Sequence, residues 1–335
     1  MSFIESVYEK AKLSKGRVAV PECTNEMMMR ACVRAAEDGL ANIMFIGNPK
    51  EIQSLAAERG LDISKISIQD AGDEAYQEEL IARYGELPNR VLGKKTVAKR
   101  MAKDPMYLAM VMEAVGDVEC TFGGLDTATY DFVMAANGVI GLNEGVVSPS
   151  AILLMEIDGW NGPQGNMFGM SDGAINTEPT PEQLAGIAIS SCDSFAKLTG
   201  REARCAMLSY STDGSGSSES VDNVRAGLQT AREKRPDLKI DGEFQADAAI
   251  VERIAAKKVK RDSEVAGKAN VLVFPDAAAC NIATKLIQQF APGHSYGPIY
   301  QGFAKPVLDC SRGDTEERIY NNVAFCSVLA AGKEA

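Results

Sequence analysis

The stretch RVAVPECTNEMMMRACVRAAEDGLANIMFIG, residues 17–47, decides the fold class. It begins with a short β-rich run from Arg17 and continues with a helical pattern that Thr24 or Asn25 can cap and Gly39 ends. A second β-rich run closes it. Two strands joined by one helix over this length predict a βαβ unit, whose strands are parallel. The sequence therefore predicts an α/β protein.

The same alternation continues along the chain. Helical patterns cover 52–59 and 74–84 and lie on both sides of Pro105, and a helix capped by Thr180 follows strand-like runs at 150–157 and 165–173. Further strands are expected near 204–211, 239–245 and 270–276, with helices at 221–235, 246–258 and 278–290. At about 150 residues per domain, 335 residues predict two α/β domains.

Charge and hydropathy exclude several classes of protein. The formal net charge is −11, and the chain lacks the Lys/Arg-rich run that a nucleic-acid-binding face needs. Charged residues interrupt the N-terminal apolar residues, and no apolar run approaches the ~20 residues of a membrane helix. We expect a soluble, cytoplasmic protein without nucleic-acid or membrane partners, in which any anionic ligand meets a local cluster of cations.

Cysteine and histidine usage limits the chemistry. Eight cysteines are spread without a C-x-x-C pair, which predicts reduced, structural thiols. The single histidine, His294, lies in a turn-like A-P-G-H-S, so we set aside histidine-activated nucleophiles and multi-histidine metal sites. No G-x-G-x-x-G fingerprint occurs, which disfavours a nicotinamide enzyme. We predict no metal and no tightly bound cofactor.

Three stretches are candidates for binding an anion. Residues 297–322 contain Ser311-Arg312-Gly313 before a predicted helix, and a hydroxyl, a guanidinium and free helical N–H groups would converge there. The triplet alone also fits an N-cap serine followed by a solvated arginine. The F-G-G-L-D-T loop, 122–127, is either a ligand-facing βα loop or a tight turn. The Gly/Ser-rich loop 212–218 is either a phosphate cradle or a mobile loop.

The last 130 or so residues resemble a known family, the phosphate acetyltransferases of the phosphate acetyl/butyryl transferase group. The resemblance is carried by five segments in the family's order and spacing: A-M-L-S-Y-S-T-D-G-S, K-R-P-D-L-K-I-D-G-E-F-Q-A-D-A-A-I-V, S-E-V-A-G-K-A-N-V-L-V-F-P-D, C-N-I-A-T-K-L-I-Q and Q-G-F-A-K-P-V-L-D-C-S-R-G. The N-terminal half is similar in R-V-A-V-P-E, A-K-D-P-M-Y and F-G-G-L-D-T.

The resemblance implies a fold, an activity and an assembly. It implies two three-layer α/β domains with mostly parallel sheets and an interdomain cleft, formed by 1–148 plus 293–335 and by 149–292, in a homodimer. The implied activity is reversible acetyl transfer between coenzyme A and phosphate through a ternary complex. Its partners would be acetyl-CoA, CoA, phosphate and acetyl phosphate.

The resemblance also implies which residues form the site. Ser311 and Arg312 match the family's catalytic pair, in which serine hydrogen-bonds the thiol or the intermediate and arginine steadies the oxyanion. The residues that would bind substrate are Arg90, Thr127, Asn281, Gln301, Lys305 and Arg318.

Two positions depart from the family pattern. Arg318 stands seven residues after Ser311, where the family has an aspartate proposed to take the thiol proton. We expect a shifted carboxylate to do this, Glu317 in preference to Asp314, with Arg318 binding CoA phosphates or lowering the thiol pKa. The family also has an arginine near the position of Val133, within the stretch 104–196 that has no lysine or arginine. Weaker phosphate binding, or another acyl acceptor or acyl size, would follow.

Other readings of the function stay open at this point. A phosphate butyryltransferase would differ only in pocket volume, and a non-catalytic acyl-CoA-sensing module would fit the two departures. A metal-dependent decarboxylating dehydrogenase would need clustered aspartates and a nicotinamide loop, neither of which the sequence contains.

Overall fold

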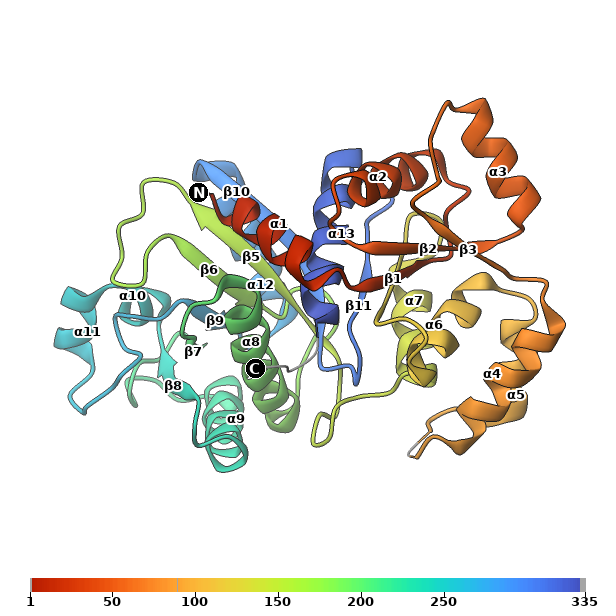
Figure 1. Ribbon diagram of the computed structural model, residues 1–335. Helices are drawn as coiled ribbons and strands as arrows, with labels where there is room; N and C mark the ends of the chain where they lie inside the picture. Colours follow the sequence, from red (N-terminus) through yellow and green to blue (C-terminus); the bar gives the residue numbers. More distant parts are fainter. Residues whose placement is uncertain (1, 89, 332–335) are drawn as a thin grey trace. The chain divides into compact units, whose positions relative to one another are not determined.

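A computed structural model describes residues 2–88 and 90–331 (Figure 1). The chain forms two compact units, residues 1–143 with 303–335 and residues 144–302. The predicted first domain included 293–301, whereas these residues form a strand in the sheet of the second unit.

The first unit contains a five-stranded, all-parallel sheet in the order β11-β4-β1-β2-β3. Its strands are β1 (Arg17–Val20), β2 (Asn42–Gly47), β3 (Ser67–Asp70), β4 (Cys120–Gly123) and β11 (Val307–Asp309). The predicted βαβ unit is present as β1, α2 (Glu26–Glu37) and β2, with Val18 opposite Ile43. Asn25 rather than Thr24 caps α2, because its side chain accepts the N–H groups of the first turn.

Helices cover both faces of this sheet. They are α1 (Phe3–Ser14), α2, α3 (Pro49–Glu58), α4 (Glu74–Glu86), α5 (Lys94–Met101), α6 (Pro105–Val115), α7 (Thr129–Val139) and α13 (Glu316–Ala330). Figure 1 shows α2 on one side of β1 and β2, with α6 on the other. Pro105 starts α6, as expected, and the methionines of α6 are buried as core filler.

The second unit contains a six-stranded sheet in the order β10-β5-β6-β9-β7-β8. Its strands are β5 (Ser150–Ile157), β6 (Met167–Ser171), β7 (Arg204–Leu208), β8 (Lys239–Phe244), β9 (Val271–Val273) and β10 (Gly293–Gln301). The run from β6 to β8 is parallel, while β5 is antiparallel to both of its neighbours. The helices are α8 (Pro181–Thr199), α9 (Glu219–Lys234), α10 (Ala246–Ile250), α11 (Glu252–Lys258) and α12 (Ala277–Phe290).

Several local predictions were wrong, and β3 was missed. His294 lies in strand β10 rather than in a turn, because β10 is an edge strand whose register shifts between Tyr296 and Ile299 and can therefore hold Pro298. The single helix predicted over 246–258 is divided at Val251, whose backbone is extended.

Other predictions are confirmed. Thr180 caps α8 through a capping box, with proline as the first helical residue. All eight cysteines are free and buried. Across residues 2–88 and 90–331, no helix has both the length and the apolar character needed to span a membrane.

Candidate active site

Three neighbouring strands of the first unit end at one edge of its sheet. β11, β4 and β1 are parallel, so the residues that follow them meet at the carboxyl-terminal edge. The strand order also reverses between β1 and β4, since β2 and β3 lie to one side and β4 and β11 to the other. Open α/β sheets bind ligands at such a switch point. The segments after β1, β4 and β11 therefore form the candidate site.

The segment after β11 presents Ser311 and Arg312 to solvent. The helix that follows does not start at Ser311: α13 begins at Glu316, and its N-cap is Thr315, whose side chain accepts the Arg318 N–H. The interpretation of Ser311 as an N-cap is therefore wrong. Arg312 has no hydrogen bond or ion pair with any residue that the structure describes. Its guanidinium is open to an anion.

The two carboxylates considered as a base point in different directions. Asp314 accepts the backbone N–H of Ser311 at 2.9 Å, and its Oδ1 lies 3.1 Å from Arg318 Nε. Its side chain is only 7% exposed. Glu317 is 58% exposed and its Oε2 lies 2.6 Å from Nη1 of Arg34 on α2. Of the pair, Asp314 is the carboxylate beside Ser311.

The loop after β4 is held by a buried carboxylate. Glu22, two residues after β1, accepts the N–H groups of Leu125 at 2.7 Å, Asp126 at 3.2 Å and Thr127 at 2.9 Å. Glu22 is 9% exposed. The loop is thus a βα loop at the sheet edge, and its amides already contact a carboxylate that belongs to the chain. That this loop and Thr127 face a ligand stays a prediction.

The same loop is fastened to the end of β11. Gly124 has φ of +97°, and a Cβ there would lie 2.5 Å from Cβ of Asp309, so only glycine fits. The Thr129 hydroxyl donates to Asp309 Oδ2 at 2.8 Å, and the Cys310 N–H donates to the Gly123 carbonyl at 2.8 Å. The Thr127 loop and the Ser311-Arg312 segment therefore share this edge.

Lys305 and Arg90 contact backbone carbonyls elsewhere in this unit. Lys305 precedes β11, at the opposite edge of the sheet, and its Nζ donates to the Glu113 carbonyl at 2.6 Å near the end of α6. Burial raises the pKa of the Glu113 carboxyl well above its usual range. Arg90 donates to the carbonyls of Gly85 and Leu87 around the end of α4. The structure does not bring either residue to Ser311, and their roles in substrate binding stay predictions.

The remaining predicted residues lie in the second unit. Asn281 is exposed on α12. Gln301 is buried at the end of β10, where its Nε2 donates to the hydroxyls of Ser150 at 3.0 Å and Ser191 at 2.8 Å. Their roles also stay predictions.

Comparison with known proteins identifies the family of this chain. Residues 2–327 match the family model described as phosphate acetyl/butaryl transferase. The chain belongs to this family. The phosphate acetyltransferase of Clostridium acetobutylicum is 38% identical over 330 residues, which cover 98% of this chain and 99% of that one. The phosphate acetyltransferase of Acetivibrio thermocellus is 37% identical over 330 residues, 98% of each chain.

The family also matches in three dimensions. A crystal structure of a phosphotransacetylase from Streptococcus pyogenes superposes with a TM-score of 0.89 at 31% identity, covering 98% of this chain and 99% of that chain. The family recognised from the C-terminal segments is therefore confirmed, and so is the α/β fold with mostly parallel sheets.

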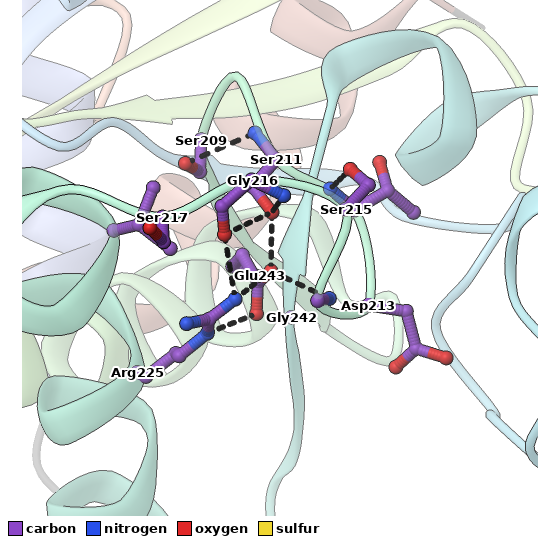
Figure 2. Close-up of polar contacts among 12 residues, drawn as sticks. Ser209, Ser211, Asp213, Ser215, Gly216, Ser217, Arg225, Gly242 and Glu243 are labelled. Carbon is purple, nitrogen blue, oxygen red and sulfur yellow. Dashed lines mark hydrogen bonds and ion pairs between the residues drawn. The ribbon is translucent and has the colours of Figure 1, made fainter.

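In this phosphate acetyl/butaryl transferase, the Gly/Ser-rich loop 212–218 is also held by a carboxylate of the chain (Figure 2). Glu243 accepts the Ser211 hydroxyl at 2.7 Å, the Gly214 N–H at 3.0 Å, and Nε and Nη2 of Arg225 at 3.0 Å each. Burial alone would raise the pKa of Glu243, but these donors outweigh it and lower the pKa to about 2. The loop is therefore not an open phosphate cradle.

Glu22 and Asp309 were not among the predicted site residues. Each lies within two residues of a strand end, Glu22 after R-V-A-V-P and Asp309 before C-S-R. The available signal was an acidic residue at a strand terminus. It becomes informative only once β1, β4 and β11 are known to be neighbours.

Proposed function

We propose that this protein is a phosphate acetyltransferase, which moves an acetyl group reversibly between coenzyme A and phosphate. Relatives of nearly the same length support this activity: the two reported above carry that name at 37–38% identity. The observation that carries the proposal is the open guanidinium of Arg312 beside Ser311, at the edge where an α/β sheet binds ligands. Substrates would be acetyl-CoA and phosphate, or CoA and acetyl phosphate.

The proposed reaction is a direct transfer in a ternary complex. The CoA sulfur attacks the carbonyl carbon of acetyl phosphate, the C–S bond forms, and the carbonyl oxygen becomes an oxyanion. Collapse of this intermediate breaks the bond to phosphate and gives acetyl-CoA. Arg312 would stabilise the oxyanion, worth about 3–4 kcal/mol for a well-placed donor, and the Ser311 hydroxyl would hydrogen-bond the sulfur or the intermediate.

The thiol proton needs an acceptor, since a thiol with a pKa of about 8.5 is mostly protonated at neutral pH. The sequence favoured Glu317, but the geometry around Ser311 favours Asp314. Arg318, paired with Asp314, would contact phosphate groups of a substrate. Lys305 and Arg90 stay proposed phosphate contacts that would require their present backbone hydrogen bonds to break.

The deciding experiment measures acetyl-CoA formation from acetyl phosphate and CoA. We expect Arg312→Ala to lower kcat by about 10²–10³-fold, because an oxyanion donor is lost. Arg30→Ala is the matched control, since Arg30 pairs with Glu26 on the surface of α2 and its loss should leave kcat unchanged. An Arg312→Ala enzyme as active as wild type would refute the site. Butyryl phosphate in the same assay tests the alternative acyl size, and acetyl-CoA binding without turnover would indicate a sensor.

We also propose that the protein is a cytoplasmic homodimer. Eight free, buried thiols suit a reducing compartment. On α12, Ile282, Leu286 and Phe290 are 61%, 49% and 81% exposed and follow one another at intervals of four residues. Such a stripe of exposed apolar side chains on one helix suits contact with a second copy of the chain.

A further inference from the structure

A second concentration of positive charge forms a groove along α5 and the start of α6. Its volume is about 700 Å³, and we call it the α5–α6 groove. It is lined by Lys95, Thr96, Lys99, Arg100, Lys103, Asp104 and Tyr107. The sequence marks this segment only as basic, and the proposed reaction does not use it.

The charge of the groove is not neutralised. Four of its seven lining residues are cations, in a chain whose formal net charge is −11. The ammonium groups of Lys95, Lys99 and Lys103 have no hydrogen bond or ion pair with the residues that the structure describes. The lining carboxylate, Asp104, is engaged as the N-cap of α6, where it accepts the Met106 N–H at 2.9 Å. Clustered cations without partners repel one another unless an anion binds.

The groove also has a flat aromatic component. Arg100 Nη1 donates to the Tyr107 hydroxyl at 2.6 Å, and the guanidinium carbon lies 5.2 Å from the centroid of the Tyr107 ring. A guanidinium plane and an aromatic ring both stack on nucleobases. The volume lies within the roughly 300–1,000 Å³ typical of small-molecule sites. These features favour a compact ligand with several negative charges and a planar base over an acidic protein surface.

We propose that the α5–α6 groove binds a nucleotide carrying at least two phosphate groups, with its lysines on the phosphates and the Arg100–Tyr107 pair on the base. Two sources have this chemistry: the nucleotide end of coenzyme A, and a free nucleotide acting as an effector. The first source rests on the proposed acetyltransferase function, and the second does not.

The position of the groove in the fold favours coenzyme A. α6 ends at Val115, shortly before β4 begins at Cys120, so the C-terminal end of α6 lies at the amino-terminal edge of the sheet. A helix that connects parallel strands runs antiparallel to them, which directs the first residues of α6 toward the carboxyl-terminal edge. Ser311 and Arg312 follow β11 at that same edge. One CoA molecule carries a thiol and a distant phosphorylated nucleotide, joined by a flexible arm.

The test is a binding titration that does not depend on turnover. The groove variant is Lys95→Gln, Lys99→Gln and Lys103→Gln combined, and its matched control is Lys50→Gln, Lys257→Gln and Lys260→Gln combined. All six lysines are exposed, so both triple variants should unfold at the wild-type temperature and carry the same charge change. The single variant Lys99→Gln replaces the triple if the triple does not fold. Calorimetry with CoA, dephospho-CoA, adenosine 3′,5′-bisphosphate and ATP gives the Kd of each.

We expect the groove variant to raise the Kd of at least one of these ligands on the order of tenfold, while the control binds as wild type does. A loss for CoA that is smaller for dephospho-CoA, which lacks the 3′-phosphate, identifies coenzyme A as the source. A loss for ATP or the bisphosphate with CoA binding unchanged identifies a free nucleotide. Equal Kd values for wild type and groove variant with all four ligands, or no binding to wild type, would overturn the inference. Wild-type nucleotide binding without acetyl transfer would instead remove only the proposed function.

Discussion

Asp314 and Glu317 are three residues apart, yet the structure gives them different surroundings. Asp314 lies in the turn before α13 and reaches back to the Ser311 N–H, whereas Glu317 lies in the first turn of α13 and pairs with Arg34 on α2. A carboxylate already fixed next to Ser311 needs less rearrangement to accept a thiol proton there.

Substitution of each carboxylate separates the two assignments. We expect Asp314→Asn to lower kcat by about 10²-fold at neutral pH, because a general base typically contributes 10²–10⁴-fold, and to recover part of the loss as pH rises and free thiolate forms. Glu317→Gln should keep kcat within about twofold, since it removes only an exposed ion pair. Full pH profiles of kcat for both variants test this, and the reverse ranking would restore Glu317.

The sequence predicted part of this site because part of it is local. Ser311 and Arg312 are adjacent in the chain, so the resemblance of one short segment to the family is enough to locate both of them. Lys305 was expected to join them, but β11 separates it from Ser311 and places its Nζ at the other edge of the sheet. The side chains of Glu317 and Arg90 point toward partners on other elements. The sequence around each residue does not specify these partners.

At the scale of elements, the loop between β4 and α7 contacts both the segment after β1 and the end of β11. Glu22 holds three of its amides, and Gly124 lets it lie against Asp309. A change at Glu22 should therefore reach the Ser311 segment through the loop rather than by direct contact.

We expect Glu22→Gln to reduce the free energy of unfolding by about 1–3 kcal/mol, because one oxygen that accepts N–H groups in a buried place becomes a donor. Glu26→Gln, at an exposed surface pair four residues on, should change it by less than about 0.5 kcal/mol. Urea unfolding of the three proteins measures both values. A Glu22→Gln protein as stable as wild type would show that water replaces the carboxylate at no cost.

The Glu243 cluster should make the second unit sensitive to acid. The pKa of the Glu243 carboxyl falls from an ordinary 4.5 to about 2 in the folded protein. The contribution of this carboxylate to stability is therefore complete above pH 4.5 and is lost as the pH falls toward 2. In Glu243→Gln, the urea midpoint should be lower at neutral pH and should fall less steeply over that interval. Identical slopes for the variant and wild type would contradict the assignment.

Elements with a strong period were predictable, and irregular ones were not. The β1–α2–β2 unit and the capped helix α8 follow from apolar spacing and cap residues. β10 was missed because A-P-G-H-S around His294 resembles a turn and Pro298 follows it, although an edge strand tolerates these residues. The break at Val251 has no proline or glycine to announce it, and tertiary packing decides it.

At the scale of the whole molecule, the exposed stripe on α12 gives the homodimer proposal a specific test. Leu286→Glu places a charge in the middle of the stripe and should convert the dimer to a monomer at micromolar concentration, because an unpaired charge buried in an interface costs several kcal/mol. Leu13→Glu, at a residue that is 86% exposed on α1, is the matched control and should leave the dimer intact. Light scattering during gel filtration measures both masses. If the Leu286→Glu protein stays a dimer, the interface does not include the exposed stripe of α12.

The carboxylates of Glu22 and Glu243 bear on how two loops of the protein respond to free anions. Each is a tethered counter-ion, so its effective concentration in its loop is fixed by the covalent chain rather than by the composition of the medium. A free anion would have to displace a side chain that cannot diffuse away. Both loops should therefore keep their shape through large swings in the concentration of free anions.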